Sequence, residues 1–379
     1  MSNGETGFVA DVLDTARLIV CIGTGGVGKT TTSAALALRA AQRGRRVLVM
    51  TIDPAKRLAN AMGLEALGNE PEAVRMPPDT KGSLDAMMLD ARRTFDDLIR
   101  RTAGDEAPSI LENRVYRLMV DRLSGTQEYM ALERLYDLYS SGRWDLVVLD
   151  TPPSTNALEF FDAPRRTANM FDERVMRWFL PEHRSDAGLL RRVFNPGAVV
   201  LRLLAIVGGE QFVSELSEFF GALRIVRASF EERGHEVRRI LGDRDTRYVL
   251  IASPDTRRVD EALLLRRKLA EERRTIDLYI LNRSHHLFEA DDLERVTRDS
   301  GTTEPMPGAF SRWYPRLVQL AERDRAGVQR LRSGLSPRDV IRLVPAFDRP
   351  IHSLTELQGI GGFLLDEPLP TGNDPGQPA

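Results

Sequence analysis

The stretch GTGGVGKT, from Gly23 to Thr30, constrains the fold of this chain more than any other. Its glycines, lysine and threonine follow the spacing G-x-x-x-x-G-K-[ST]. The apolar run LIVCI before it predicts a buried parallel strand, and alanines and leucines at helical spacing predict a helix over residues 29–43 that stops at Gly44. A second apolar run, RVLVMTID, ends at Asp53. Strand, loop, helix and strand within about 35 residues make a βαβ unit.

The same alternation continues along the chain. Further apolar runs predict strands at residues 144–150, 247–253 and 276–282. This pattern is typical of an α/β fold with a mostly parallel sheet flanked by helices. We expect one domain over residues 1–365. A helical subdomain is expected within it at 156–241, where no strand pattern occurs, and residues 366–379 are a polar tail expected to be disordered.

The glycine loop predicts an anion-binding site. Glycines let successive N–H groups turn inward, and the following helix adds its positive end. Lys29 would lie on the β- and γ-phosphates of ATP, with the Thr30 hydroxyl on Mg²⁺. The alternative, an ordinary glycine-rich turn, is disfavoured because the loop lies between a strand and a helix. The residues expected to bind phosphate are Gly23, Thr24, Gly25, Gly26, Val27, Gly28, Lys29, Thr30 and Thr31.

Two aspartates end predicted strands. Asp150 closes the run DLVVLD at the carboxyl end of the sheet, where ligands bind in open α/β folds. We expect it to lie near Mg²⁺ together with Thr30, although an aspartate that starts a turn is the alternative. Asp53 precedes a proline, and by itself it fits a helix N-cap as well as a catalytic carboxylate.

Composition narrows the class of protein. The net charge of −2 argues against a nucleic-acid partner held by phosphate contacts. The single cysteine, Cys21, excludes a disulfide framework, a cysteine-based zinc site and an iron–sulfur cluster. The N-terminal residues do not follow a signal-peptide pattern, and no apolar run reaches the roughly 18 residues of a spanning helix. We therefore expect a cytoplasmic protein, which could still associate peripherally with a membrane.

Five motifs resemble those of a known family, in the family's order: GTGGVGKTTT, TIDPAKRL, LSGTQEYM, LVVLDTPPSTNAL and ILNR. Together they resemble the ArsA/Get-type ATPases, the arsenite-pump and tail-anchored-protein-targeting group of the deviant-Walker-A P-loop class. The resemblance runs from Leu18 to Leu365 and is strongest to a bacterial branch, typified by actinobacterial chains, in which two such ATPases act as a pair.

The resemblance implies roles for individual residues. Asp53 would polarise the attacking water and act with Lys29 in catalysis, and Asn282 would read the adenine edge, with Pro345 and Phe347 covering the base. The positions that match switch or dimer-facing residues are Lys56, Glu128, Thr151, Pro153 and Asn156. ATP and Mg²⁺ are the implied ligands, with no zinc and no iron–sulfur cluster.

This chain departs from the family pattern at several positions. Thr24 stands where the family has a lysine that reaches across the dimer, and Lys56 and Asn156 stand where it has histidines in the two switches. The family's zinc site and metalloid site each need several cysteines, whereas this chain has only Cys21, so it can form neither site. None of these departures affects Lys29, Thr30, Asp53 or Asp150.

The resemblance implies Mg²⁺-dependent ATP hydrolysis coupled to opening and closing of a homodimer, or of a heterodimer with a paralogous ATPase subunit. Membrane-protein targeting or a related membrane process is the expected role. The alternatives are a catalytically weak, nucleotide-binding regulatory subunit and a MinD/ParA-like positioning ATPase. A hydrophobic client helix or membrane protein would need an apolar groove, for which Phe219 and Phe220 are candidates, but apolar residues at helical spacing are more often core.

Overall fold

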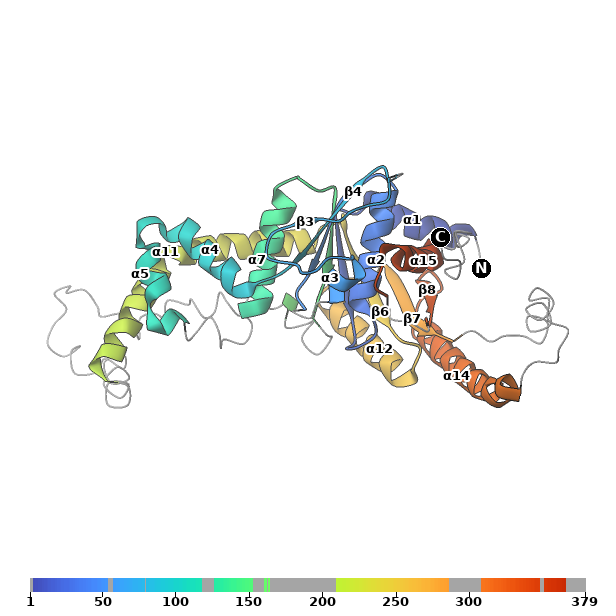
Figure 1. The fold of residues 1–379 in the computed structure, drawn as a ribbon. Coiled ribbons are helices and arrows are strands. Elements are labelled where there is room, and N and C mark those ends of the chain that lie inside the picture. Colours follow the sequence, from blue (N-terminus) through green and yellow to red (C-terminus); the bar gives the residue numbers. More distant parts are fainter. Residues whose placement is uncertain are drawn as a thin grey trace. The chain divides into compact units, whose positions relative to one another are not determined.

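The computed structural model describes residues 3–53, 57–78, 80–117, 126–152, 160–161, 163, 209–285, 308–347 and 351–365. The chain divides into two compact units. The first takes Met1–Met88, Arg143–Leu158 and Arg244–Ala379, and the second takes Leu89–Gly142 and Glu159–Asp243. Figure 1 labels many of their elements. The helical subdomain expected from the sequence covers residues 156–241, whereas the second unit also includes Leu89–Gly142.

The first unit contains the sheet. Its described strands follow the order β3-β4-β2-β5-β1-β6-β7-β8. All neighbouring pairs are parallel except β3 and β4. The strands are β1 (Leu18–Gly23), β2 (Arg46–Thr51), β3 (Glu72–Ala73), β4 (Ser83–Met88), β5 (Leu146–Asp150), β6 (Thr246–Ala252), β7 (Leu278–Ser284) and β8 (Val340–Pro345). The predicted α/β class with a mostly parallel sheet is therefore confirmed.

Apolar runs without alternation explain why the central strands are parallel. Every residue of β1 and β5 is buried, as expected for strands that are covered on both faces. Ile19 and Cys21 belong to the large core cluster, and Leu18 and Val20, which point to the opposite face, are equally buried. The helices therefore flank the sheet on both sides.

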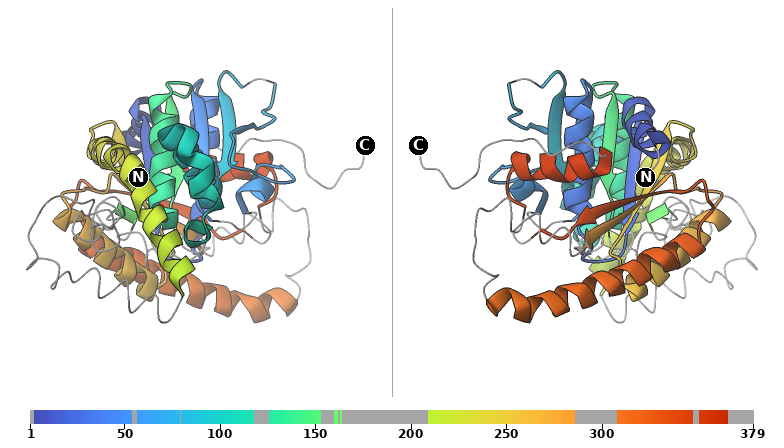
Figure 2. Two further views of the ribbon diagram at one scale, coloured as in Figure 1. Left: turned by 90° about the vertical axis from the view of Figure 1, so that its left-hand side faces the viewer. Right: turned by 90° about the vertical axis from the view of Figure 1, so that its right-hand side faces the viewer.

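Two groups of helices cover this sheet. The helices α1 (Asn3–Thr15), α2 (Lys29–Gln42) and α15 (Leu354–Leu365) pack against one another and contribute to the same core cluster. The helices α12 (Thr256–Glu271) and α14 (Gly308–Ser333) pack together against β6 and β7. Figure 2 shows α15 in red and α14 in orange as separate elements. The short α3 (Arg57–Ala61) follows β2.

The second unit is helical in its described residues. Its elements are α4 (Ala91–Ala103), η1 (Gly104–Glu106), α5 (Ala107–Glu112), α7 (Thr126–Ser140) and α11 (Glu210–Leu241). Its core contains an aromatic cluster in which Tyr116 lies between Phe95 and Phe219, with ring centroids 5.5 and 6.3 Å away. Phe219 and Phe220 are both buried, so these two side chains belong to the core of their own unit.

None of the helices within the described ranges is both long enough and apolar enough to cross a membrane. The tail at 366–379 and most of residues 156–208 lie outside the described residues.

Candidate functional site

The loop between β1 and α2 requires its glycines for conformation and for space. Gly26 and Gly28 have φ angles of 76° and 87°, in the left-handed region that favours glycine. A Cβ on Gly28 would lie 2.4 Å from Nδ2 of Asn282, and a Cβ on Gly23 would lie 2.0 Å from the carbonyl oxygen of Ile251. Other residue types would therefore change both the path of the loop and its contact with β6 and β7.

Lys29 begins α2 and folds back over this loop. Its Nζ donates to the carbonyl oxygen of Thr24 at 3.2 Å, and its side chain is mostly buried. Burial lowers the pKa of Lys29, while the carboxylates of Asp150 and Asp53 oppose that shift. The ammonium group thus lies over a loop whose backbone N–H groups already favour an anion.

Asp150 ends β5 and lies beneath the loop, because β5 pairs with both β1 and β2. Its Oδ2 accepts hydrogen bonds from Thr30 Oγ1 at 2.7 Å and from Thr51 Oγ1 at 2.8 Å. Its Oδ1 is buried and has no hydrogen-bond partner among the described residues. Burial raises the pKa of Asp150, and the two threonine bonds oppose that shift.

This donor set suits a magnesium ion. A carboxylate oxygen without a partner and an adjacent threonine hydroxyl are hard oxygen ligands, and Mg²⁺ usually keeps several waters besides one or two such groups. Within the described ranges, no group of three His, Cys, Asp or Glu side chains is placed to hold a metal ion. A hydrated Mg²⁺ shared with phosphate oxygens needs no such group.

Asp53 lies just after β2 at the mouth of the site. Its backbone N–H donates to Thr51 Oγ1 at 3.2 Å, and its side chain is 30% exposed. Arg57 Nη1 lies 3.4 Å from Asp53 Oδ2. Thr151, which follows Asp150, donates from Oγ1 to the carbonyl oxygen of Cys21 at 2.8 Å. A carboxylate in this position can orient a water molecule in front of the loop.

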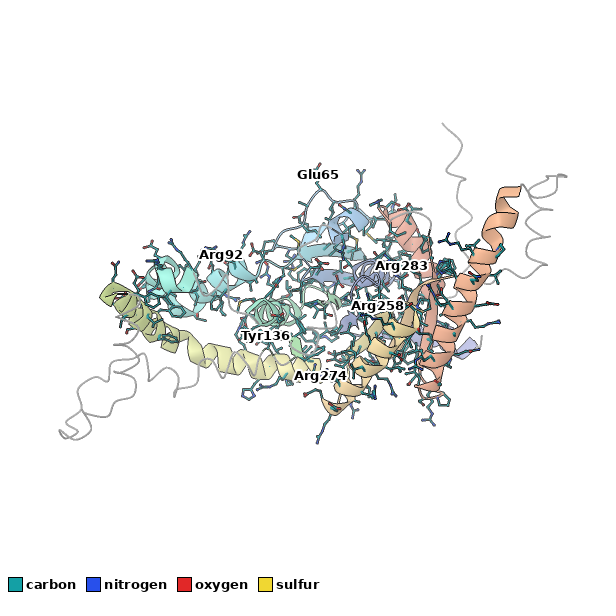
Figure 3. The ribbon with its side chains drawn as sticks, turned by 90° about the horizontal axis from the view of Figure 1, so that it is seen from below. Glu65, Arg92, Tyr136, Arg258, Arg274 and Arg283 are labelled. Carbon is teal, nitrogen blue, oxygen red and sulfur yellow. The ribbon has the colours of Figure 1, made fainter. Side chains whose placement is uncertain are left out.

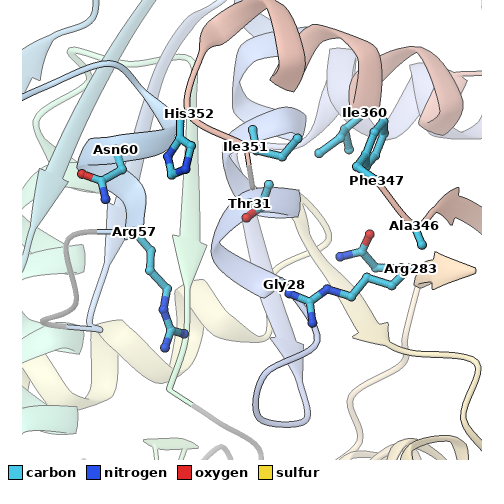
Figure 4. A pocket seen from close by; sticks show the side chains of 11 residues that line it. Gly28, Thr31, Arg57, Asn60, Arg283, Ala346, Phe347, Ile351, His352 and Ile360 are labelled. Atoms are coloured by element: carbon cyan, nitrogen blue, oxygen red, sulfur yellow. The ribbon is translucent and has the colours of Figure 1, made fainter. Parts of the chain in front are cut away.

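Two adjoining cavities meet at the loop. One of about 320 Å³ is lined by Gly26, Gly28, Lys29, Thr30, Thr31, Asp53, Arg57, Thr151 and Arg283; we call it the phosphate cavity. The other, of about 550 Å³, shares Gly28, Thr31, Arg57 and Arg283 and adds Asn60, Asn282, Ala346, Phe347, Ile351, His352 and Ile360; we call it the base cavity, and Figure 4 shows it. The first is lined mainly by polar residues, and the second combines polar residues with the apolar side chains of Phe347, Ile351 and Ile360, a lining that suits a polyphosphate joined to an aromatic base.

The base cavity contains two residues predicted to contact adenine. Phe347 is 41% exposed and packs edge-to-face on Phe363, with ring centroids 6.2 Å apart. Asn282 donates from Nδ2 to the carbonyl oxygen of Val27 at 2.8 Å, which fixes its amide and connects β7 to the loop. Pro345, the last residue of β8, is not among the lining residues but directly precedes two of them, Ala346 and Phe347.

Other predicted site residues lie elsewhere. Glu128 is buried in the first turn of α7, in the second unit. Lys56, Pro153 and Asn156 lie outside the described residues. Thr24 is in the loop, but its side chain is completely buried, and its Oγ1 has no hydrogen-bond partner in the described part of the chain.

Arg283 is a site residue that the sequence reasoning missed. It lines both cavities, directly after Asn282. In a regular strand, residues 282 and 283 would point to opposite faces, so the sequence pattern gave no signal for it. Ile351 and Ile360 were missed because apolar residues near the end of a chain fit a core helix equally well.

Cavities of this kind, built on an inward-turned glycine loop above a buried aspartate, define the class of P-loop nucleotide-binding proteins. A family model described as anion-transporting ATPase matches residues 16–296, and the chain belongs to this family. The resemblance inferred from the five motifs is therefore confirmed.

Similar proteins come from bacteria and fungi. The chain is 31% identical over 248 residues to Protein Rv2184c of Mycobacterium tuberculosis, across 57% of this chain and 58% of that protein. It is 32% identical over 153 residues to ATPase get3 of Aspergillus niger and 30% identical over 153 residues to ATPase GET3 of Paracoccidioides lutzii, in each case across 40% of this chain and 43% of the relative. The chain thus spans about half the length of the curated relatives it matches.

Proposed function

We propose that this protein binds ATP with Mg²⁺ and hydrolyses it to ADP and phosphate. One observation carries the proposal: the Asp150 carboxylate is held by the hydroxyls of Thr30 and Thr51 directly beneath a glycine loop covered by Lys29. This geometry brings a metal-binding oxygen, a hydroxyl and a cation to one end of a helix. Membership of an ATPase family supports the same activity.

Each residue has a distinct task in this proposal. The loop N–H groups and Lys29 hold the phosphates, and Thr30 and Asp150 hold Mg²⁺, which neutralises charge on the phosphate oxygens. Asp53, at the mouth of the phosphate cavity, orients and polarises the attacking water. In the base cavity, Asn282 offers Oδ1 to the exocyclic amine of adenine, since Nδ2 is already bonded to Val27. Phe347 covers the base.

The coupling of this chemistry to a partner belongs to the proposal as well. Relatives in the family are named as ATPases, and the motif resemblance favours a homodimer or a heterodimer with a paralogous subunit whose opening follows the nucleotide. Membrane-protein targeting is the process we propose, on the resemblance alone. The switch positions Lys56, Glu128, Thr151, Pro153 and Asn156 are the proposed dimer-facing or nucleotide-sensing residues.

A second candidate is a nucleotide-binding regulatory subunit with very slow turnover. The specific observation in its favour is Thr24, which is uncharged and completely buried and so offers no cation to a neighbouring subunit. Steady-state turnover of the isolated chain, with and without a paralogous partner, separates the two candidates. If turnover of the paired complex does not fall when this chain carries Asp53→Asn, the regulatory subunit is favoured.

The test of ATP binding and hydrolysis uses two substitutions and one control. Lys29→Ala should nearly abolish ATP binding by titration calorimetry, because it removes the only lysine of the loop. Asp53→Asn should keep binding but release phosphate at least about tenfold more slowly, since a neutral amide polarises water less. Lys268→Ala, at an exposed lysine in the last turn of α12, should change neither. Normal turnover by the Asp53→Asn protein would contradict the role given to this carboxylate.

A further inference from the structure

The end of β7 contains an irregularity next to the proposed ATP site. In the parallel pair of β7 and β8, Asn282 lies opposite Val344 and Ser284 lies opposite Pro345, so Arg283 is an extra residue in the strand. Its φ angle is 63°, in the left-handed region that is costly for a side chain with a Cβ. Bulges of this kind redirect a side chain, and strained residues of this kind occur at functional sites.

A comparison within the chain shows that this conformation is unusual here. Among the described residues, the other non-glycine residue with a positive φ is Arg273, which follows the end of α12. Left-handed residues are common directly after helices, where they satisfy the last carbonyl groups. Arg283 has no such helix end before it, so its conformation belongs to the bulge between β7 and β8 and not to a helix cap.

The bulge has a direct consequence for the site. Asn282 and Arg283 are consecutive, yet both lie at the mouth of the loop instead of on opposite faces of the sheet. Asn282 connects β7 to the loop through its hydrogen bond to Val27. Arg283 lines the phosphate cavity, the base cavity and a third cavity of about 290 Å³ that also includes Gly25, Gly26 and Val27 of the loop. In Figure 4, the Arg283 side chain extends from the end of β7 toward Gly28.

The charge of Arg283 also differs from that of the arginines around it. Three neighbours have carboxylate partners: Arg57 lies 3.4 Å from Asp53, Arg258 2.9 Å from Glu261 and Arg323 3.2 Å from Asp324. The Arg283 side chain is exposed and has no hydrogen bond or ion pair with the residues that the structure describes. Its guanidinium is therefore available to an anion in the cavities that it lines.

We propose that Arg283 binds the phosphate chain of the nucleotide held by the loop of its own chain. This inference rests on the proposed ATP site and adds a phosphate-binding cation to it. A guanidinium presents parallel N–H donors that match two phosphate oxygens. The loop itself contains one cation, Lys29, so Arg283 supplies a second from a different strand. Binding of the anion offsets the cost of the left-handed backbone.

The test compares charge, shape and backbone strain at one position. The variants are Arg283→Gln, which removes the charge, Arg283→Lys, which keeps a point charge, and Arg283→Gly, which removes both side chain and strain. The matched control is Arg258→Gln. This arginine is labelled with Arg283 in Figure 3, lines the third cavity but neither the phosphate cavity nor the base cavity, and has Glu261 as a partner. Titration calorimetry measures the binding of Mg·ATP, Mg·ADP and adenosine to each protein.

Removing the charge should weaken binding of both phosphorylated ligands and leave binding of the nucleoside alone. We expect Arg283→Gln and Arg283→Gly to bind Mg·ATP and Mg·ADP about ten- to hundredfold more weakly, the loss expected for a charge-assisted hydrogen bond. Arg283→Lys should recover only part of the affinity, because its ammonium keeps the charge but lacks the paired donors. Adenosine should bind all variants within about twofold, and Arg283→Gly should melt no lower than the wild type because its backbone is no longer strained.

The outcomes separate the inference from the function on which it rests. If the wild type binds neither Mg·ATP nor Mg·ADP, the proposed function fails and this inference fails with it. If the wild type binds both and Arg283→Gln binds them equally well, the function stands and the inference is overturned. Equal weakening of adenosine and ATP would overturn it too, because the side chain would then contact the base or support the fold. Equal weakening by Arg258→Gln would show a general charge effect and would count against the inference.

Discussion

Asp150 is held in a site that is unfavourable for its charged form. The carboxylate is completely buried beneath the loop, and burial raises its pKa despite the bonds from Thr30 and Thr51. A carboxyl group whose pKa is raised on folding binds more protons in the folded state than in the unfolded state. Its contribution to the stability of the fold is therefore lost as pH rises from the pKa of the unfolded chain to the pKa of the folded protein. A cation bound beside Oδ1 would compensate the buried charge.

Asp150→Asn should therefore separate stability from activity. Because the amide is uncharged, we expect the variant to melt at the same temperature as the wild type or higher at pH 8. Mg²⁺-dependent phosphate release should fall at least about hundredfold, as for the loss of one strong electrostatic contact in a transition state. Thermal melting and a phosphate-release assay over a range of Mg²⁺ concentrations measure the two effects.

The control for this substitution lies beside the other end of the same strand. Asp145, next to the start of β5, is partly exposed and pairs with Arg46 at 2.6 Å. Asp145→Asn removes the same charge and should leave the dependence on Mg²⁺ unchanged. A decrease in turnover by Asp145→Asn as large as that by Asp150→Asn would mean that the strand, and not the metal site, had been damaged.

At the scale of residues, the sequence predicted those positions whose role follows from spacing. Lys29 and Thr30 lie where a glycine loop between strand and helix requires them, and Asp150 lies where an apolar strand ends. Arg283 was not predictable, because its orientation comes from a bulge in the pairing of β7 with β8. The burial of Thr24 was also not predictable, since a threonine in a loop fits a surface position equally well.

At the scale of elements, strands with continuous apolar runs were predicted and mixed ones were missed. The runs predicted near β1, β2, β5, β6 and β7 all form strands. The strand β4, with sequence SLDAMM, contains an aspartate and follows a loop-rich segment, so its pattern did not identify it. The strand β8, VIRLVP, contains an arginine that is completely buried on folding. Tertiary contacts, not local propensity, determine such strands.

The helices of the second unit are joined by a buried ionic cluster. Glu133 on α7 is 1% exposed, and its Oε1 accepts from Nε of Arg233 on α11 at 2.5 Å. Arg233 also pairs with Asp137, and Arg101 of α4 pairs with Asp137 at 2.6 Å. Burial raises the pKa of Glu133 to about 7, an effect that Arg233 opposes and Asp137 reinforces. This cluster connects three helices through two carboxyl groups, and the pKa of one of them, Glu133, lies near neutral pH.

The stability of α7 should therefore depend on pH. The pKa of Glu133 in the unfolded chain is near 4.5 and rises to about 7 on folding. The folded state therefore holds the extra proton between these values, and stability falls as pH rises through that window. We expect the free energy of opening of α7 to fall by on the order of 1–3 kcal/mol between pH 5 and pH 8. Hydrogen-exchange protection of its amides, corrected for the intrinsic rate, measures this.

The matched control uses a glutamate on the neighbouring helix. Glu133→Gln should remove the dependence on pH, whereas Glu236→Gln, at an exposed position of α11 paired with Arg239, should leave it unchanged. If protection of α7 stays constant with pH in the wild type, the buried cluster does not control its opening.

At the scale of the whole molecule, the chain passes between the two units four times. It leaves the first unit after Met88 and after Leu158, and it returns at Arg143 and at Arg244. The first departure follows directly from the carboxyl end of β4, and the second comes eight residues after Asp150, at the carboxyl end of β5. The loop also opens at this edge of the sheet. The strands β4 and β5, after which the chain leaves the first unit, therefore end at the same edge of the sheet as the one where the loop lies.

The one thiol in this chain is buried, so its rate of chemical labelling can report on opening of the first unit. Cys21 lies inside β1 and is completely buried, so we expect a thiol-reactive dye to reach it only when the first unit opens. Burial also raises the pKa of this thiol to about 12, which slows its reaction further. Since a ligand that binds only the closed form reduces opening by the factor 1 + [L]/Kd, labelling should slow about hundredfold at a nucleotide concentration of roughly 100 Kd.

The control is a cysteine that is exposed whether or not the unit opens. In a Cys21→Ala protein that also carries Leu264→Cys, at an exposed position of α12, labelling should be fast and indifferent to nucleotide. A labelling rate of Cys21 that ATP does not change would mean that the dye reaches β1 without opening of the unit. If ATP does slow the labelling, the dependence of the rate on ligand concentration gives the affinity of the wild-type protein for any nucleotide. The measurement needs neither a labelled ligand nor hydrolysis.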